Sequence, residues 1–150
     1  MNKQIYVNLP VRDLERSKAF FSALGFRFNP QFSDRNAACM IISDDIYVML
    51  LVEPFFQGFT GKPVVDARAA TEVLVCLSCD SRAAVDELAA KARAAGGALP
   101  EEPKDYGFMY QHGFEDLDGH MWGLNHMVSM PPATGDGQAE QAGQRAAAHA

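Results

Sequence analysis

The sequence has no run of basic residues and no long apolar stretch. Lysine and arginine together number 13 against 19 acidic residues, so the formal net charge is −6. Nucleic-acid binding needs a clustered basic surface, and so does attraction to an anionic membrane. No apolar segment approaches the roughly 20 residues that a membrane-spanning helix requires. We therefore expect neither a nucleic-acid partner nor a membrane partner.

Cysteine is scarce, and the first residues lack the apolar core of an export signal. The apolar stretch near the N-terminus is interrupted by Asn8 and Pro10, and the chain holds only three cysteines. This combination favours a cytoplasmic protein with reduced thiols. Cys76 and Cys79 form a C-x-x-C pattern, but Cys76 lies inside an apolar run rather than at a helix start. Cys79, just ahead of a predicted helix, is a candidate for a lowered pKa.

The last 20 residues contain no apolar side chain larger than alanine, apart from two prolines. Such a segment cannot bury enough surface to order itself, so 131–150 is predicted to be a flexible tail. The remaining residues, 1–130, are enough for one domain with a hydrophobic core. The whole chain is 48% hydrophobic and 21% charged, which is ordinary for a soluble globular protein.

The first half of this domain alternates between patterns typical of strands and a pattern typical of one helix. Asp13 stands where a helix N-cap belongs, apolar residues follow at helical spacing, and Gly25 ends the helix. The β-branched and aromatic segments around the helix predict strands. The predicted order is a strand at 5–9, a helix near 13–24, and strands at 26–32, 38–42 and 46–52.

The second half repeats this order. Asp80 or Ser81 caps a second amphipathic helix, which Gly96 ends. The predicted elements are a strand at 71–79, a helix near 81–95, a short strand at 98–101, and strands at 106–114 and 120–127. The chain is therefore predicted to be an α+β protein of two tandem β-α-β-β-β units, 4–52 and 71–127.

The connector between the two units, 53–70, is rich in aromatic residues. It contains Phe55, Phe56 and Phe59, which is unusual apolar content for a linker. Two interpretations stay open at this point. The rings could cover one end of the core, or they could form a lid or a dimer contact.

Two segments carry a resemblance to a known family. The sequence from Val7 to Val11 and from Asp13 to Ser17 resembles the first strand and helix start of the vicinal oxygen chelate superfamily, which includes glyoxalases, bleomycin-resistance proteins and extradiol dioxygenases. Phe114 to His120 resembles its closing hairpin, F-x-D-P-D-G, with Leu117 in the proline's place. The stretch from Gln4 to Met127 is similar to the branch of predicted lactoylglutathione lyases. The resemblance implies a curved sheet around a cavity, and a homodimer.

The resemblance also implies four metal-ligand positions, two in each unit, that converge on one Ni, Zn, Mn, Fe or Mg ion. Such a site needs imidazole or carboxylate donors. The four positions fall on Tyr6, Met49 (Leu50 if the register slips by one), Leu74 and Gly123. Gly123 stands where related sequences carry a glutamate. These residues do not form a donor set, so we predict no metal ligands and no cofactor.

Strand alternation places further polar residues on the same faces as these four positions. The ligand-binding candidates are then Tyr6, Asn8, Met49, Leu74, Cys76, Gly123 and Asn125. Their amide, thiol and phenol groups suit a polar organic ligand. In the alternative interpretation, a buried asparagine satisfies the end of a strand and a strand cysteine belongs to the core.

The histidines and turn carboxylates are weaker candidates. His120 and Asp116 belong to a predicted turn, where we expect their side chains to reach solvent. His126 has the opposite strand parity to Gly123, so it should point away from the ligand side. The facing of His112 is not set by the sequence, which leaves open an unusual metal site that includes it.

Three functional hypotheses follow. The first is a pocket protein that binds a small, partly aromatic organic molecule without a metal. The second is a divalent-metal-dependent lyase or isomerase of the lactoylglutathione lyase type, or a dioxygenase-like enzyme, in which Glu72 is a weak candidate for the catalytic base. The third is a non-catalytic homodimer whose surface binds another protein. The sequence does not decide whether the protein is an enzyme.

Overall fold

The structure is a computed structural model, and it describes residues 2–129. The predicted tail at 131–150 lies outside the described residues. The chain divides into two compact units, 1–69 and 70–150. Within the described part, no helix is long and apolar enough to cross a membrane.

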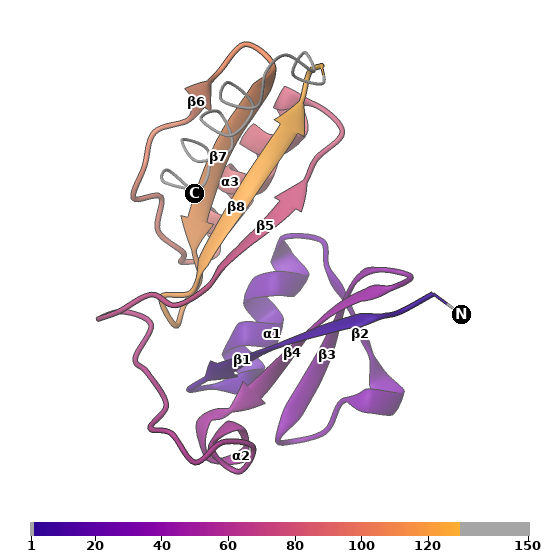
Figure 1. The fold of residues 1–150 in the computed structure, drawn as a ribbon, viewed down its shortest axis with the longest axis vertical. Coiled ribbons are helices and arrows are strands. Elements are labelled where there is room, and N and C mark those ends of the chain that lie inside the picture. Colours follow the sequence, from indigo (N-terminus) through magenta and orange to yellow (C-terminus); the bar gives the residue numbers. More distant parts are fainter. Residues whose placement is uncertain (1, 130–150) are drawn as a thin grey trace, which may run out of the picture. The chain divides into compact units, whose positions relative to one another are not determined.

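The first unit is a four-stranded mixed sheet with one long helix on one face (Figure 1). Its strands lie in the order β1-β4-β3-β2, with β1 parallel to β4 and the other neighbours antiparallel. The elements are β1 (Ile5–Val11), α1 (Leu14–Ala23), β2 (Arg27–Asn29), the 3-10 helix η1 (Pro30–Phe32), β3 (Ala37–Ser43), β4 (Ile46–Val52) and α2 (Glu53–Gln57).

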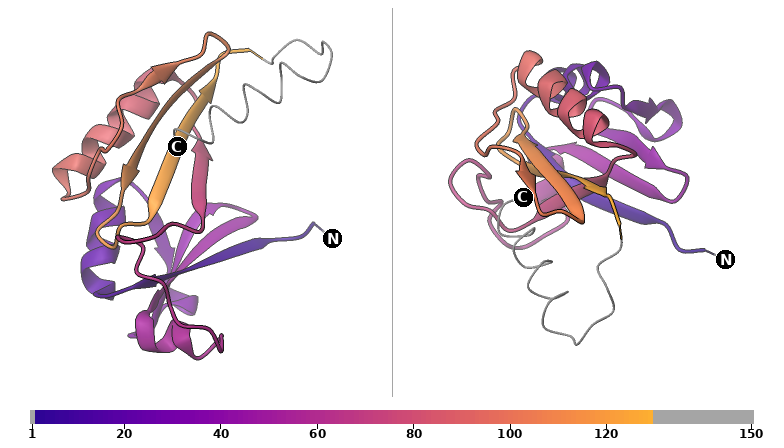
Figure 2. Two further views of the ribbon diagram at one scale, coloured as in Figure 1. Left: turned by 60° about the vertical axis from the view of Figure 1, so that its left-hand side comes forward. Right: turned by 90° about the horizontal axis from the view of Figure 1, so that it is seen from above.

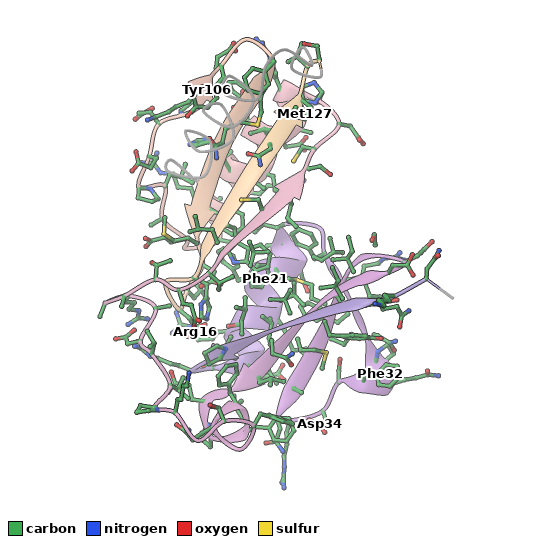
Figure 3. All side chains as sticks on the ribbon, viewed as in Figure 1. Arg16, Phe21, Phe32, Asp34, Tyr106 and Met127 are labelled. Atoms are coloured by element: carbon green, nitrogen blue, oxygen red, sulfur yellow. The ribbon has the colours of Figure 1, made fainter. Side chains whose placement is uncertain are left out.

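Helix α1 is stabilised by a capping residue at its start and by a buried apolar face. The side chain of Asp13 accepts a hydrogen bond from the backbone N–H of Arg16 at 3.1 Å. Phe20 and Phe21 are 2% and 1% exposed, so the apolar face of the helix is buried (Phe21 is labelled in Figure 3). Gly25 follows with a φ of 102°, a left-handed conformation that glycine adopts without strain.

The second unit repeats this plan. Its strands lie in the order β5-β8-β7-β6, with β5 parallel to β8 and the rest antiparallel. The elements are β5 (Leu74–Ser78), α3 (Arg82–Ala94), β6 (Lys104–Asp105), β7 (Met109–Glu115) and β8 (Met121–Met127). The α+β prediction with two β-α-β-β-β units is therefore confirmed. The enclosed cavity stays a prediction.

Helix α3 covers one face of the second sheet, as the left view of Figure 2 shows. Ser81, rather than Asp80, caps the helix by accepting a hydrogen bond from the backbone N–H of Ala84 at 3.0 Å. Below the helix, Phe114 and Trp122 are almost fully buried and stack with their ring centroids 6.0 Å apart. Such aromatic packing contributes much of the stability of a small core.

Four predicted strands differ from the structure. The strand at 26–32 ends at Asn29, because its side chain caps a turn that begins with Pro30, and proline cannot donate to the sheet. The strand at 98–101 is wrong: only Ala98 forms a bridge, and β6 comes after Pro103. The strands at 71–79 and 106–114 each begin three residues later than predicted, at Leu74 and at Met109.

The aromatic connector forms a short helix that was not predicted. Phe55 and Phe59 lie edge to face, with ring centroids 5.2 Å apart. Phe55 is 39% exposed and Phe59 is 71% exposed, whereas Phe56 is half-buried. The interpretation that all three rings cover the core is therefore wrong for Phe59. Phe32 of η1 is also 61% exposed (Figure 3).

Candidate functional site

The first sheet has one face against α1 and one opposite it. Leu9 and Leu50 are strand partners and are buried on the α1 side. Tyr6, Asn8 and Met49 lie on the other face, which we call the Tyr6 face, because Asn8 pairs with Met49 and neighbouring residues of a strand alternate. The structure therefore places Met49, and not the alternative Leu50, on the same face as Tyr6.

Two stacked tyrosines dominate the Tyr6 face. The rings of Tyr6 and Tyr47 lie 4.9 Å apart at an interplanar angle of 13°, and Tyr6 is 48% exposed. The Tyr6 hydroxyl donates to Gln4 Oε1 at 3.0 Å, and Asn8 Nδ2 donates to the carbonyl oxygen of Tyr6 at 3.2 Å. Desolvation and then the nearby Tyr6 phenol raise the pKa of Tyr47. The Tyr47 phenol is therefore neutral at neutral pH, and both rings present partly exposed aromatic surface.

The second sheet also has a face opposite its helix, which we call the Gly123 face. Trp122 and Leu124 are buried on the α3 side, so Gly123 and Asn125 point the other way. The rows of cross-strand partners on the Gly123 face are Leu74–Met121–Glu115, Cys76–Gly123–Gly113 and Ser78–Asn125–Gln111. The structure thus brings the predicted residues Leu74, Cys76, Gly123 and Asn125 together on one face.

Sequence reasoning missed Gln111. This side chain is 2% exposed and lies directly opposite Asn125. Asn125 is half-buried, and its Oδ1 atom is inaccessible and has no hydrogen-bond partner. A signal for Gln111 was present in the sequence: counting back from the turn between β7 and β8 sets it across from Asn125.

The thiols are protonated at neutral pH. Cys76 is exposed, and desolvation raises the pKa of its thiol, while a hydrogen bond with the Gly123 backbone opposes this shift. The expected lowered pKa of Cys79 is wrong, because desolvation and then the Asp80 carboxylate raise it. Since the thiolate is the nucleophile, neither residue is activated for covalent catalysis.

Glu72 lies outside the sheet. It is exposed, and β5 begins two residues later, so strand alternation does not place its side chain on the Gly123 face. Its role as a catalytic base stays a prediction.

The turn between β7 and β8 corrects two predictions. Asp116 is 7% exposed and His120 is 9% exposed, so neither side chain reaches solvent freely. Asp116 Oδ1 accepts hydrogen bonds from the backbone N–H groups of Asp118 and His120, and Oδ2 accepts one from Trp122 Nε1 at 3.0 Å. Burial raises the pKa of Asp116, whereas the His120 charge and these donors oppose the rise. Asp116 is therefore a structural carboxylate.

The remaining histidines point away from the Gly123 face. His112 pairs with Leu124, on the α3 side, and its Nε2 lies 3.1 Å from the carbonyl oxygen of Glu101. His126 was predicted to point away from the Gly123 face, and the strand register agrees. Its Nδ1 lies 2.9 Å from the carbonyl oxygen of Cys79. This pairing places His112 off the Gly123 face, and an unusual metal site that includes His112 remains untested.

Comparisons with known proteins agree on the family. A family described as bleomycin resistance protein-like N-terminal matches residues 3–43. A hypothetical protein from S. aureus is 33% identical over 84% of this chain and 95% of its own, with a TM-score of 0.72. A glyoxalase/bleomycin resistance protein/dioxygenase family enzyme from Burkholderia phytofirmans PsJN has a TM-score of 0.69 at 20% identity, over 84% of this chain and 99% of its own. The chain belongs to the vicinal oxygen chelate superfamily.

The same fold occurs in a protein with a different role. TnmS3, an antibiotic binding protein from Streptomyces sp. CB03234, is 21% identical, with a TM-score of 0.61 over 85% of this chain and 97% of its own. No curated protein sequence matches this chain. The vicinal oxygen chelate fold therefore comes with more than one function among these neighbours.

The metal of the vicinal oxygen chelate superfamily does not fit the residues present at the four positions. The Tyr6 phenol is hydrogen-bonded to Gln4, Met49 offers only a thioether, and Leu74 and Gly123 offer no donor atom. A hard divalent cation prefers oxygen and imidazole ligands. Among residues 2–129, no three His, Cys, Asp or Glu side chains form a group that could hold a metal ion.

Proposed function

We propose that this protein binds small, partly aromatic organic molecules without a metal ion, and that the Tyr6 face and the Gly123 face are each a binding surface. The proposal rests on the side chains that occupy the four positions where the family carries its metal ligands. They hold a phenol, a thioether, an isobutyl group and no side chain, and the strand register puts each on the face opposite its unit's helix. A surface of this composition suits an organic ligand better than a cation.

The residues on these faces have complementary roles in the proposal. The exposed ring of Tyr6, held in place by its stack on Tyr47, provides a flat apolar surface. Asn8 on the Tyr6 face and Asn125 on the Gly123 face each provide an amide group that can orient the polar edge of a ligand. Cys76 contributes a neutral thiol, which behaves as a small apolar group.

Two neighbours with the same fold support small-molecule binding. One is TnmS3, described as an antibiotic binding protein, and another is a fosfomycin resistance protein from Mesorhizobium loti. The alternative of a metal-dependent lyase or isomerase has no observation in its favour among the described residues. The homodimer and the cytoplasmic location stay predictions.

The test is a binding titration with three flat aromatic probes: naphthol, coumarin and quinolin-2-one. Chemical shifts of backbone amides are followed in proton–nitrogen spectra, with and without a chelator. We expect shifts on β1, β5 and β8, unchanged by chelator. Tyr6→Leu should weaken binding about fivefold through loss of the ring surface, which is worth on the order of 1 kcal/mol.

Phe32→Leu is the matched control, because it removes an exposed aromatic ring from η1. It should leave the affinity unchanged. The proposal is wrong if none of the three probes shifts these strands, or if chelator abolishes the binding.

A further inference from the structure

The Gly123 face has a strip without side chains next to a pair of amides. Gly113 and Gly123 are cross-strand partners, and the next pair on the same face is Gln111 and Asn125. Residues two apart in a strand are separated by about 6.6 Å. The glycine pair thus leaves about 13 Å between the amide row and the row that contains Met121, which is the length of one fused ring system.

Glycine stands at positions 113 and 123 for different physical reasons. A Cβ atom on Gly113 would lie 2.6 Å from the carbonyl oxygen of Trp122, so the packing of β7 on β8 requires glycine there. Gly123 does not have the positive φ that would demand glycine, so its backbone is open to other residues. The φ angle at position 123 therefore does not require glycine, and the absence of a side chain there leaves this part of the sheet face uncovered.

Asn125 has unused hydrogen-bonding capacity at the end of this strip. Its Oδ1 atom is buried and has no partner in the folded chain, although an amide oxygen accepts two hydrogen bonds. An unsatisfied buried acceptor lowers stability, and groups of this kind call for a reason other than folding. A rotation of the half-buried Asn125 side chain would bring Oδ1 to the surface of the strip, where a ligand N–H group would supply the missing donor.

We propose that Gly113, Gly123 and Asn125 form a subsite for a flat ring with an amide-type edge, such as a lactam, cyclic urea or ring carboxamide. The ring lies over the glycine pair, and its N–H group donates to Asn125 Oδ1. Gln111, buried beside Asn125, completes the polar end of the subsite. This inference rests on the proposed function and specifies the chemical class of the ligand.

The first test compares two nearly identical probes. Quinolin-2-one has a lactam N–H, whereas coumarin has the same ring with an oxygen in place of that group. We expect the native protein to bind quinolin-2-one about tenfold more tightly, because coumarin leaves the buried acceptor unpaired. The dissociation constants come from titrations that follow the backbone amides of β8. Equal binding of both probes overturns the subsite but leaves the proposed function standing, whereas failure of naphthol, coumarin and quinolin-2-one alike overturns both.

The second test uses variants. Asn125→Leu should bind both probes with equal affinity, and its thermal midpoint should be unchanged or higher, because the substitution removes an unpaired buried acceptor. Gly123→Ala should weaken both probes several-fold, since its methyl group enters the strip. Gly61→Ala is the matched control: a Cβ atom there meets nothing within 4 Å, so binding should not change. A lower midpoint for Asn125→Leu would assign Asn125 a structural role and overturn the proposal, as would unchanged binding to Gly123→Ala.

Discussion

At the scale of single residues, Asp116 is the clearest case of a group that looks functional and is structural. Its two oxygens accept three hydrogen bonds, from the N–H groups of Asp118 and His120 and from the indole of Trp122. These bonds fix the turn between β7 and β8 and orient the largest buried side chain of the second unit. Because the Asp116 carboxylate makes these three hydrogen bonds within the folded chain, its role is to stabilise the turn.

Asp116→Asn should therefore lower the free energy of unfolding by about 1–3 kcal/mol, because the new amide N–H₂ group faces an N–H donor. Urea denaturation followed by tryptophan fluorescence measures the loss. Asp44→Asn, in the exposed turn of the first unit, is the control and should change stability by less than about 0.5 kcal/mol. Equal stability of native protein and Asp116→Asn would mean that these bonds do not hold the turn.

Strand alternation predicted which residues share a face, but it did not predict burial in turns. Tyr6, Asn8 and Met49 lie together as expected, and so do Cys76, Gly123 and Asn125. Burial of a turn carboxylate depends on what packs above it. For Asp116 this is an indole from the following strand, six positions away along the chain, and local pattern carries no signal for that contact.

At the scale of elements, a tyrosine links α3 to β7. The Tyr110 hydroxyl donates to Asp86 Oδ1 at 2.7 Å, and the guanidinium of Arg82 lies 5.6 Å from the centre of the Tyr110 ring. The hydrogen bond to Asp86 is the largest cause that raises the pKa of Tyr110 to about 12, followed by desolvation. The neutral phenol therefore stabilises the docked helix.

This link gives a pH dependence with a definite sign. The pKa of Tyr110 in the folded chain is about 12, above the ordinary value of 10.0. Its contribution to stability is thus fully present below pH 10 and is lost as pH rises towards 12. Asp86→Asn should bring the pKa of Tyr110 down towards its ordinary value, measured as tyrosinate absorbance relative to Tyr110→Phe.

Arg82→Gln is the control for this titration. The cation of Arg82 lowers the pKa of Tyr110, so its removal should leave that pKa as high or higher. If Asp86→Asn leaves the titration unchanged, the hydrogen bond does not link the helix to the strand in solution.

Helix ends were predicted well because capping residues are local signals, whereas short strands were not. Asp13 and the Asp80–Ser81 pair mark both helix starts, and the structure selects Ser81. The two-residue strand β6 has no alternation that could be recognised, since its only support is pairing with β7. The single turn of α2 likewise contacts β1 and β4, and a local sequence pattern does not show such contacts.

At the scale of the whole molecule, the sequence predicted the repeated β-α-β-β-β unit but not the class of ligand. Two β-α-β-β-β units follow from caps, turns and apolar periodicity, which recur at half the chain length. The ligand class depends on what lies beside Gly123, and the buried amide of Gln111 was recognised only from the strand pairing. The cavity and the homodimer implied by the resemblance stay predictions.

The central claim is that this member of the vicinal oxygen chelate superfamily works without a metal, and one measurement tests it most directly. Purified protein is analysed for Ni, Zn, Mn, Fe and Mg, and its thermal midpoint is recorded with and without a strong chelator. A bound ion at a hundredfold excess over its dissociation constant stabilises by about 3 kcal/mol, which corresponds to roughly 6–12 °C for a chain of this size. We expect well under one metal ion per chain and the same midpoint in both samples. A stoichiometric metal together with a chelator-induced fall of several degrees would contradict the account.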